Sequence, residues 1–361
     1  NFKMLSKIEK AQTRPFDMSR IRRILIRYTN WVGDAVMALP ALEAVRDNFP
    51  ESEITVVGRP WITPLLESHP AVDRILSLNK KGRFTADLIE ILRLVRHIRR
   101  IGFDLAFLFQ NAFEAAFIAR LGGIPLRIGY DTDGRGFLLS HAVSRDKNRP
   151  ESHQVDYYIE MLKALGLEAR GHDPRLYVSA ENQQSARSLL FRNDLGDDDF
   201  LVGLSPGAAF GPAKRWPTDR FADVGDRAVE AWRAKVLIFG SRDERDIGEK
   251  VRTTMKHDAL DLCGGTSLGE VMALISRCRL FVTNDSGLMH IASALSVPTV
   301  AVFGSTNPVA TGPRSQNAVV IQHKTECSPC LKPRCPGDFG CMLGVEADQV
   351  WNELLRLKER L

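Results

Sequence analysis

The stretch RILIRYTNWVGDAVMALPALEAV, residues 23–45, decides the fold class of this chain. It begins with a short aliphatic run at 24–26, turns at Gly33, and continues with apolar residues spaced as in a helix. An aliphatic strand without polar alternation is buried on both faces, and such strands alternate with helices in parallel α/β sheets. The stretch therefore predicts a parallel sheet that is covered by helices.

The same alternation of strand and helix occurs twice, with a pause in the Gly-, Asp- and Ser-rich stretch 131–149. Strands of the first set are expected at 24–26, 54–57, 74–76, 105–109 and 127–130. Strands of the second set are expected at 201–204, 235–239, 260–263, 280–283 and 299–303. Two such sets predict two Rossmann-like, doubly wound α/β domains.

We expect the chain to have four parts. Residues 1–19, which begin with Asn1 and not with Met, are expected to be an N-terminal extension or a tag remnant. The two Rossmann-like domains are expected at 20–175 and 176–345. The helix expected at 346–361 could pack back on the first domain.

The segment 87–100 shows the clearest helical pattern of the chain. Its apolar residues recur on one face, with the arginines displaced from it; they are Leu88, Ile91, Leu92, Val95 and Ile98. The pattern predicts an amphipathic helix.

Composition narrows the classes of function. The chain has 361 residues, of which 44% are hydrophobic and 26% charged, and a formal net charge of +5. These values exclude wholesale disorder, and the positive surplus is too small to indicate a nucleic-acid partner. No run approaches the roughly 18–20 apolar residues of a membrane span, and the first residues lack the apolar core of a secretory signal. We therefore expect a cytoplasmic protein.

Loops that follow strands are the places to search for a site, because open parallel sheets bind ligands at the carboxyl ends of their strands. The first such loop is TNWVGD, residues 29–34, where Asp34 opens a helix. A helix cap is the alternative interpretation, since Asp at a helix start satisfies free backbone N–H groups.

Three loops of the second domain together suit a nucleoside diphosphate. SPGAAFGPAKRWP, residues 205–217, lets backbone approach a ligand at Gly207 and supplies a cation at Lys214. TNDSGLMH, residues 283–290, offers free N–H groups at a helix start, and Glu244 could accept hydrogen bonds from a ribose diol. Solvated loop cations and ordinary helix caps are the alternatives.

Four cysteines crowd into the loop 327–341 with the spacing C-x2-C-x4-C-x5-C; they are Cys327, Cys330, Cys335 and Cys341. This spacing allows a structural zinc ion, and reduced loop thiols are the alternative.

Three motifs in this order resemble the ADP-heptose:lipopolysaccharide heptosyltransferases, most closely the heptosyltransferase II branch. They are GDAVMALPA at 33–41, the 205–217 loop with its KRWP, and NDSGLMH at 284–290. The resemblance covers nearly the whole chain from about residue 20. It implies a GT-B glycosyltransferase, in which two Rossmann-like domains face a cleft and bind the acceptor and the ADP-sugar respectively.

The resemblance implies transfer of L-glycero-D-manno-heptose from ADP-heptose to the inner core of lipopolysaccharide, with Asp34 as the catalytic base. The residues implied in ADP-heptose binding are Gly207, Lys214, Glu244, Asp285, Ser286, Gly287 and His290. A single base without a covalent nucleophile implies inversion at the anomeric carbon. No cofactor is expected for catalysis, because Lys214 and a helix N-terminus can neutralise the leaving ADP.

The acceptor implied by the resemblance is a lipid A–Kdo–heptose glycan, so we expect peripheral contact with the inner membrane surface. Candidate contacts to the acceptor and the membrane are the basic residues Arg59, Lys80, Lys81 and Arg83. Solvated loop cations without such a role are the alternative.

Other functions stay open at this level. One is a nucleotide-sugar epimerase of the same architecture, and another is a transferase of the same family with a different sugar or acceptor. A nucleic-acid-binding module would use the arginines at 20–27 or 93–100, but aromatic residues do not alternate with them.

Overall fold

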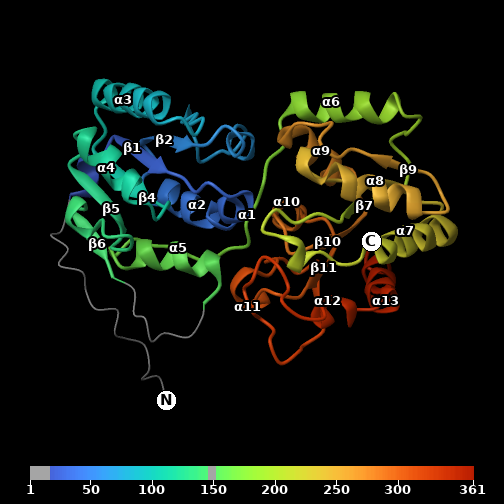
Figure 1. Cartoon of the computed structure of the whole chain (residues 1–361). Coiled ribbons are helices and arrows are strands. Elements are labelled where there is room, and N and C mark those ends of the chain that lie inside the picture. The colour runs from blue at the N-terminus through green and yellow to red at the C-terminus, as the bar shows by residue number, and fades with distance from the viewer. Residues whose placement is uncertain (1–16, 145–151) are drawn as a thin grey trace, which may run out of the picture. The chain divides into compact units, whose positions relative to one another are not determined.

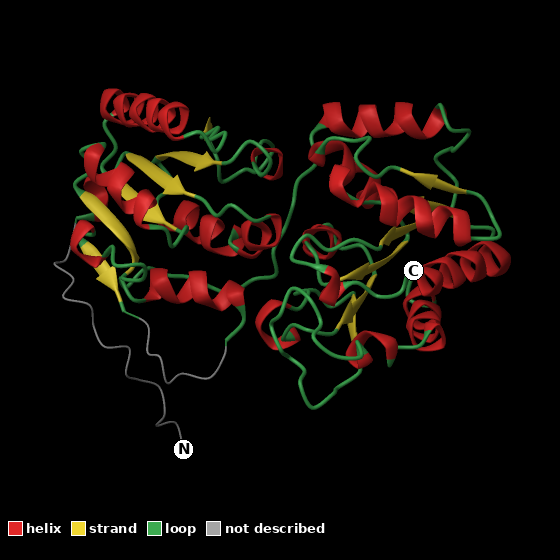
Figure 2. Ribbon diagram, in the orientation of Figure 1, coloured by secondary structure: helices red, strands yellow, loops and turns green. Residues whose placement is uncertain are grey.

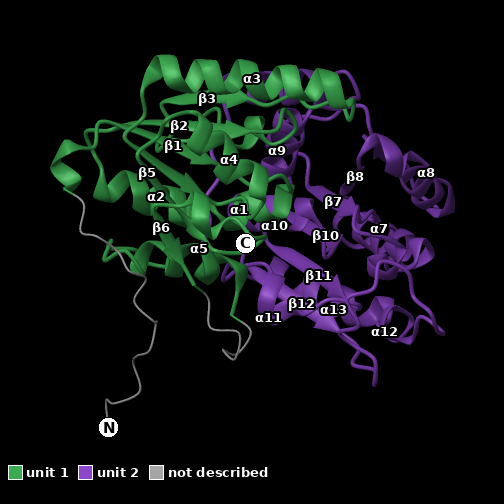
Figure 3. Ribbon diagram, turned by 60° about the vertical axis from the view of Figure 1, so that its left-hand side comes forward, with its two compact units in different colours: residues 1–172 green, residues 173–361 purple. Residues whose placement is uncertain are grey.

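Two parallel six-stranded sheets organise the chain in the computed structural model, which describes residues 17–144 and 152–361. The chain divides into one unit that ends at His172 and a second that begins at Asp173, close to the expected boundary after residue 175 (Figure 3). Most of the expected N-terminal extension lies outside the described residues. The predicted α/β class with two Rossmann-like domains is confirmed.

The first sheet has the strand order β3-β2-β1-β4-β5-β6, with every neighbouring pair parallel. Its strands are β1 (Arg23–Arg27), β2 (Glu53–Gly58), β3 (Arg74–Ser77), β4 (Leu105–Leu108), β5 (Leu126–Tyr130) and β6 (His141–Val143). Ile24 in β1 pairs with both Ile54 and Leu105, so β1 lies at the centre. The chain leaves β1 toward β2 and later returns to place β4 on the other side, which makes the β1–β4 border a topological switch point.

Helices cover both faces of this sheet (Figures 1 and 2). One face carries α1 (Val32–Met37), α2 (Leu39–Asn48) and α5 (Gln154–Lys163), which pack on one another. The other carries α3 (Phe84–Ile101) and α4 (Phe113–Leu121), and the short helix η3 (Gly136–Leu138) lies next to α4. The unpredicted strand β6 falls in the polar stretch 131–149, where three residues are too few to show a pattern.

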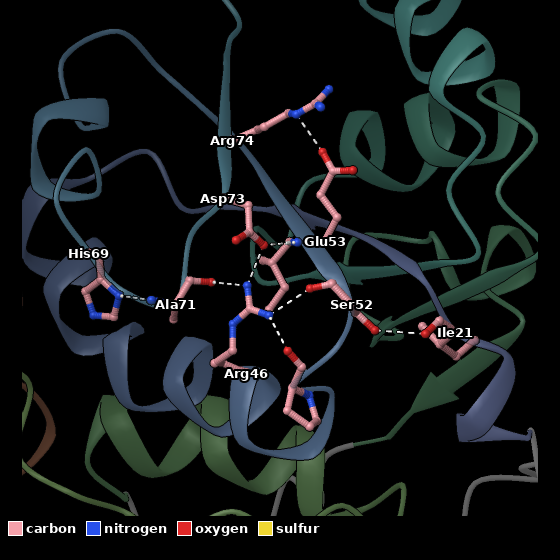
Figure 4. A network of polar contacts seen from close by, with 10 residues as sticks. Ile21, Arg46, Ser52, Glu53, His69, Ala71, Asp73 and Arg74 are labelled. Carbon is pink, nitrogen blue, oxygen red and sulfur yellow. Dashed lines mark hydrogen bonds and ion pairs between the residues drawn. The ribbon is translucent and has the colours of Figure 1, made fainter.

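Polar contacts hold the amino-terminal ends of β2 and β3 together (Figure 4). Arg46 of α2 donates to the carbonyl oxygen of Ser52 at 2.7 Å and pairs with the Asp73 carboxylate. The same carboxylate oxygen accepts the Ile54 N–H at 2.7 Å. Because this network lies at the amino edge, it stabilises the sheet away from the edge where ligands bind.

The second sheet repeats the order of the first, as β9-β8-β7-β10-β11-β12. Its strands are β7 (Leu201–Ser205), β8 (Lys235–Ile238), β9 (Ala259–Asp261), β10 (Leu280–Asn284), β11 (Thr299–Phe303) and β12 (Ala318–Gln322). Its longer helices are α6 (Ala180–Phe191), α7 (Thr218–Trp232), α8 (Arg245–Thr254), α9 (Leu268–Arg277), α10 (Gly287–Ala294) and α13 (Ala347–Lys358); α11 (Pro308–Thr311) and α12 (Gly340–Leu343) are single turns. The switch point of this unit is the β7–β10 border.

The final helix packs on the second unit, so the expectation that it returns to the first is wrong. Helix α13 contacts α7 and strands β10, β11 and β12, and it buries Val350, Leu354 and Leu357 in the core of that unit. Trp351 stacks on Trp232 with ring centroids 4.6 Å apart. The apolar stripe of the helix thus covers a sheet face that its own unit would otherwise leave exposed.

Helix α3 is confirmed, but only part of its apolar face is buried. Val95 and Ile98 are buried and Ile91 is half-buried, whereas Leu88 and Leu92 are exposed. An amphipathic helix normally turns its whole apolar face toward the core. The amino-terminal half of α3 departs from this rule.

Candidate functional site

A buried ion pair marks the carboxyl edge of the second sheet, between the loops after β7 and β10. The Lys214 ammonium lies 2.6 Å from Oδ2 of Asp285, and both side chains are largely buried. The same oxygen accepts a hydrogen bond from the Thr306 hydroxyl at 2.6 Å. Lys214 also lies over the ring of Phe210, 4.8 Å from its centroid. The sequence places Lys214 and Asp285 in separate motifs, and the fold brings them into contact.

Asn284, the last residue of β10, holds the 205–217 loop in place. Its side-chain oxygen accepts the Trp216 N–H at 2.9 Å, and its amide group donates to the carbonyl of Pro206 at 2.8 Å. Trp216 is itself buried and donates through Nε1 to the Val345 carbonyl. A fully buried amide with these partners fixes where the loop, and therefore Lys214, can lie.

Gly207 and Glu244 meet in the structure. A Cβ at Gly207 would lie 2.3 Å from the Glu244 carboxyl group, so a larger residue cannot replace this glycine without displacing the glutamate. One oxygen of Glu244 accepts from the N–H and hydroxyl of Ser241 in a capping box. The helix-cap interpretation of Glu244 is therefore correct for that oxygen, while the carboxyl group also faces the 205–217 loop.

Helix α10 begins at Gly287, with Ser286 as its N-cap residue. The Ser286 hydroxyl accepts a long hydrogen bond from Met289 N–H and lies 3.2 Å from the Thr283 hydroxyl. The first N–H groups of a helix have no partner within the helix, and the helix dipole makes that end positive. His290 is buried within the same helix. The structure thus brings the residues that were expected to bind ADP-heptose to one edge of the second sheet.

Thr306 is a further member of this site, which no motif of the sequence indicated. It lies in the loop after β11, where Ser305 and Thr306 follow Gly304 and are buried. The rule that ligands bind after strand ends would have pointed to this loop as well. Its role depends on contact with Asp285, which the sequence alone does not show.

The loop 327–341, which carries the four cysteines, is hydrogen-bonded to two other loops of this site. The N–H of Leu331 donates to the Ser305 carbonyl at 2.8 Å, and the Pro333 carbonyl accepts the Ala213 N–H at 3.1 Å. A Cβ at Gly211 would lie 2.2 Å from the Pro333 oxygen, and the φ of Gly211 is +152°, so this close approach requires glycine.

The four cysteines lie in one region but form no ready metal site. Cys327 is exposed and Cys341 buried. Burial raises the pKa of the Cys341 thiol, and the three other thiols of the loop add to the shift. In the described part of the chain, no three His, Cys, Asp or Glu side chains are placed to hold a metal ion. A structural zinc therefore stays a prediction.

In the first unit, Asp34 lies in the first turn of α1 and is half-buried. Trp31 occupies the N-cap position without a side-chain cap bond, so Asp34 is not the N-cap residue. Burial raises the pKa of the Tyr158 hydroxyl well above its usual range, and the Asp34 carboxylate contributes to the shift. Asp34 therefore lies near a tyrosine that stays protonated at neutral pH, at the carboxyl end of β1.

The predicted acceptor residues divide into two pairs. Arg59 donates to the carbonyls of Leu78 and Lys80, and Lys80 pairs with Glu114 at 2.5 Å. Lys81 and Arg83 are exposed. The first pair helps to hold the loop before α3 in place, and the second pair is accessible to a ligand.

Arg27, at the end of β1, is a buried cation, although in the sequence it stands only as part of a cluster of arginines. It donates to the carbonyls of Tyr28 and Val57, and burial lowers its pKa to about 10. A buried arginine of this kind is not available to contact the phosphates of a nucleic acid.

Within the described residues, no helix is both long and apolar enough to cross a membrane.

Comparison with known proteins gives the site a family context. The model of glycosyltransferase family 9 (heptosyltransferase) matches residues 91–338. Lipopolysaccharide heptosyltransferase 2 of Salmonella typhimurium is 31% identical over 83% of this chain and 88% of that protein. Lipooligosaccharide heptosyltransferase 2 of Campylobacter jejuni is 31% identical over 93% of this chain and 99% of that protein. The solved structure of the Escherichia coli ADP-heptose lps heptosyltransferase II covers 94% of this chain with a TM-score of 0.80 and 28% identity.

Proposed function

The chain belongs to glycosyltransferase family 9, the heptosyltransferases, and we propose that it transfers L-glycero-D-manno-heptose from ADP-heptose to the inner core of lipopolysaccharide. The observation that carries the proposal is the cluster of Lys214, Asp285 and Thr306 beside the start of α10. It supplies a cation, free N–H groups and buried acceptors at the switch point, where a nucleoside diphosphate binds in this fold class.

The second unit then holds the donor. Lys214 shares its charge between Asp285 and the diphosphate, and the N–H groups at the start of α10 receive phosphate oxygens. Both groups oppose negative charge that grows on ADP as the bond to the anomeric carbon breaks, so they stabilise the transition state more than the ground state. Glu244, held beside Gly207, accepts hydrogen bonds from the ribose.

The first unit supplies the base. A sugar hydroxyl ionises far above neutral pH, so its attack on the anomeric carbon requires a group that removes the proton during bond formation. Asp34 takes this proton as the acceptor oxygen bonds to the anomeric carbon and ADP leaves from the opposite face. The reaction inverts the configuration of that carbon.

The branch of the family indicates the acceptor. Relatives at 30–32% identity are named heptosyltransferase 2, whereas a heptosyltransferase 1 of Pseudomonas aeruginosa and a heptosyltransferase 3 of Escherichia coli are 25% identical. We therefore assign a lipid A–Kdo–heptose type acceptor to this chain. Such an acceptor is anchored in a lipid bilayer, so the enzyme works from the cytoplasm in peripheral contact with the inner membrane.

The test is transfer of heptose to a set of delipidated core glycans, with the product detected by mass spectrometry. We expect transfer to the Kdo–heptose glycan and little to Kdo alone. Asp34→Asn should lower kcat about 10²- to 10⁴-fold and leave ADP affinity unchanged. Asp47→Asn, at an exposed position of α2, is the matched control and should change neither.

Two results would contradict the proposal. One is an altered nucleotide sugar formed without any acceptor, which is the behaviour of an epimerase. The other is near-native turnover of the Asp34→Asn variant, which would remove Asp34 from the chemistry.

A further inference from the structure

The amino-terminal half of α3 exposes large apolar side chains. Phe84, the first residue of the helix, is 84% exposed, and Leu88 and Leu92 are 45% and 40% exposed. They follow one another at intervals of four residues, so they form a stripe along the helix. The same apolar face is buried further along, at Val95 and Ile98.

A second group of exposed aromatic residues lies on α4 and on the neighbouring short helix η3. Phe113 and Phe117 of α4 are 40% and 41% exposed, and Phe137 of η3 is 78% exposed. The ring centroid of Phe113 lies 6.1 Å from that of Phe117 and 6.1 Å from that of Phe137, so the three rings form one cluster.

The two groups lie at the same end of neighbouring helices. Lys80, just before α3, pairs with Glu114 in the first turn of α4 at 2.5 Å. Helices α3 and α4 pack on each other over a shared core that includes Ile98 and Ala119. We call the exposed residues of both groups the apolar patch: Phe84, Leu88, Leu92, Phe113, Phe117 and Phe137.

Basic residues lie near the apolar patch, in the loop before α3 and on α3 and α4 themselves. Those that are exposed are Lys81, Arg83, Arg93, Arg96 and Arg120. Acidic side chains lie nearby as well: Glu90 pairs with Arg93 at 2.6 Å, Asp87 accepts the Lys81 N–H at 2.7 Å, and Asp133 accepts the Phe113 N–H at 2.7 Å. Lys81, Arg83, Arg96 and Arg120 make no ion pair among the described residues, so unpaired positive charge borders the apolar residues.

We infer that the apolar patch is the surface by which the enzyme docks on an anionic lipid bilayer. Phenylalanine and leucine side chains enter the boundary between head groups and acyl chains, while lysine and arginine contact anionic head groups. A protein partner with an acidic surface would match the charge as well, but only a bilayer carries the membrane-anchored acceptor assigned above. The docking surface therefore rests on the proposed function.

The experiment is flotation with vesicles of phosphatidylethanolamine and phosphatidylglycerol, and with vesicles of phosphatidylcholine alone. We expect the full chain to bind the anionic vesicles and to be released by salt. Phe84→Asp and Phe137→Asp should each weaken binding about tenfold or more. Arg96→Glu should weaken it at least about fivefold.

Matched controls lie on α6 of the second unit. Phe191→Asp changes a phenylalanine that is 80% exposed, and Arg187→Glu changes an exposed helical arginine. Neither should alter vesicle binding. Equal losses for the control and patch variants, or no binding of the full chain to anionic vesicles, would overturn the inference. So would a dimer in sedimentation velocity that Phe84→Asp converts to monomers, because a second copy would then cover the patch.

Transfer to the delipidated glycan separates this inference from the proposed function. The Phe84→Asp and Phe137→Asp variants should keep that transfer while losing vesicle binding. Transfer without vesicle binding by the unaltered chain refutes the docking surface alone. Vesicle binding without transfer refutes the proposed function and leaves the docking surface in place.

Discussion

Replacing Lys214 with Met tests both the stability and the ligand role of the buried pair. The change leaves the Asp285 carboxylate, which is 5% exposed, with the Thr306 hydroxyl as its remaining donor among the contacts described above. Removing one partner of a buried ion pair costs about 3–5 kcal/mol. Because Thr306 still donates, we expect the lower end, about 3 kcal/mol.

The destabilisation falls on the second unit, which contains both Lys214 and Asp285. A loss of about 3 kcal/mol should lower its Tm by about 6–12 °C. Lys214→Met should also weaken ADP binding about 10- to 100-fold, since a hydrogen bond to a charged group contributes about 1.5–3 kcal/mol. Lys250→Met, at an exposed position of α8, is the control and should change neither quantity.

A double variant separates the two roles. Asp285→Asn added to Lys214→Met removes the unpaired charge, so the free energy of unfolding should recover by about 1–2 kcal/mol while ADP binding stays weak. Calorimetry measures the Tm and the ADP affinity of each variant. An unchanged Tm for Lys214→Met, or no recovery in the double variant, would refute the reasoning on the buried pair. An unchanged ADP affinity would show that Lys214 does not meet the diphosphate.

Three further predictions concern other parts of the chain. Leu354→Ala should lower the free energy of unfolding by about 2–5 kcal/mol, because Leu354 is fully buried in the core of the second unit. The control Leu355→Ala, on the exposed side of α13, should lower it by less than about 0.5 kcal/mol; urea unfolding measures both. Iodoacetamide at pH 8 should label exposed Cys327 before Cys278, because burial raises the pKa of the Cys278 thiol and keeps it protonated; protection of Cys327 that disappears with a chelator would instead indicate a bound zinc ion. Transfer should persist in EDTA, because Lys214 and the start of α10 oppose the charge on ADP, and activity that requires added Mg²⁺ or Mn²⁺ would contradict this.

Much of the fold could be predicted because its signals are local. A continuous apolar run, such as Ile-Leu-Ile in β1 or Leu-Phe-Val in β10, indicates a strand covered on both faces, whatever lies elsewhere in the chain. Short or weakly patterned elements escaped this reasoning. Helix α6 buries only Ala186 and Leu190, so its apolar periodicity is faint.

The sequence by itself also indicated the loops after β7, β8 and β10 as parts of the candidate site, because ligands bind after strand ends in parallel sheets, but it did not single out the loop after β11. Only the tertiary structure decided the partners within the site. Lys214 and Asp285 are 71 residues apart in sequence, and Thr306 is a further 21 residues away. Nothing in the spacing of the motifs shows that one carboxylate oxygen receives both donors.

The sequence is limited in the same way when it comes to which apolar helix faces are buried and which charged side chains are paired. The apolar stripe of α13 is visible in the sequence, but its burial in the second unit depends on which sheet face is left uncovered. Helix α3 carries one periodic face, of which the core covers only the later half. Arg59 and Lys80 contact their own protein while Lys81 and Arg83 reach solvent. Periodicity is a property of neighbouring residues, whereas burial and pairing depend on chain segments that packing brings together from far apart.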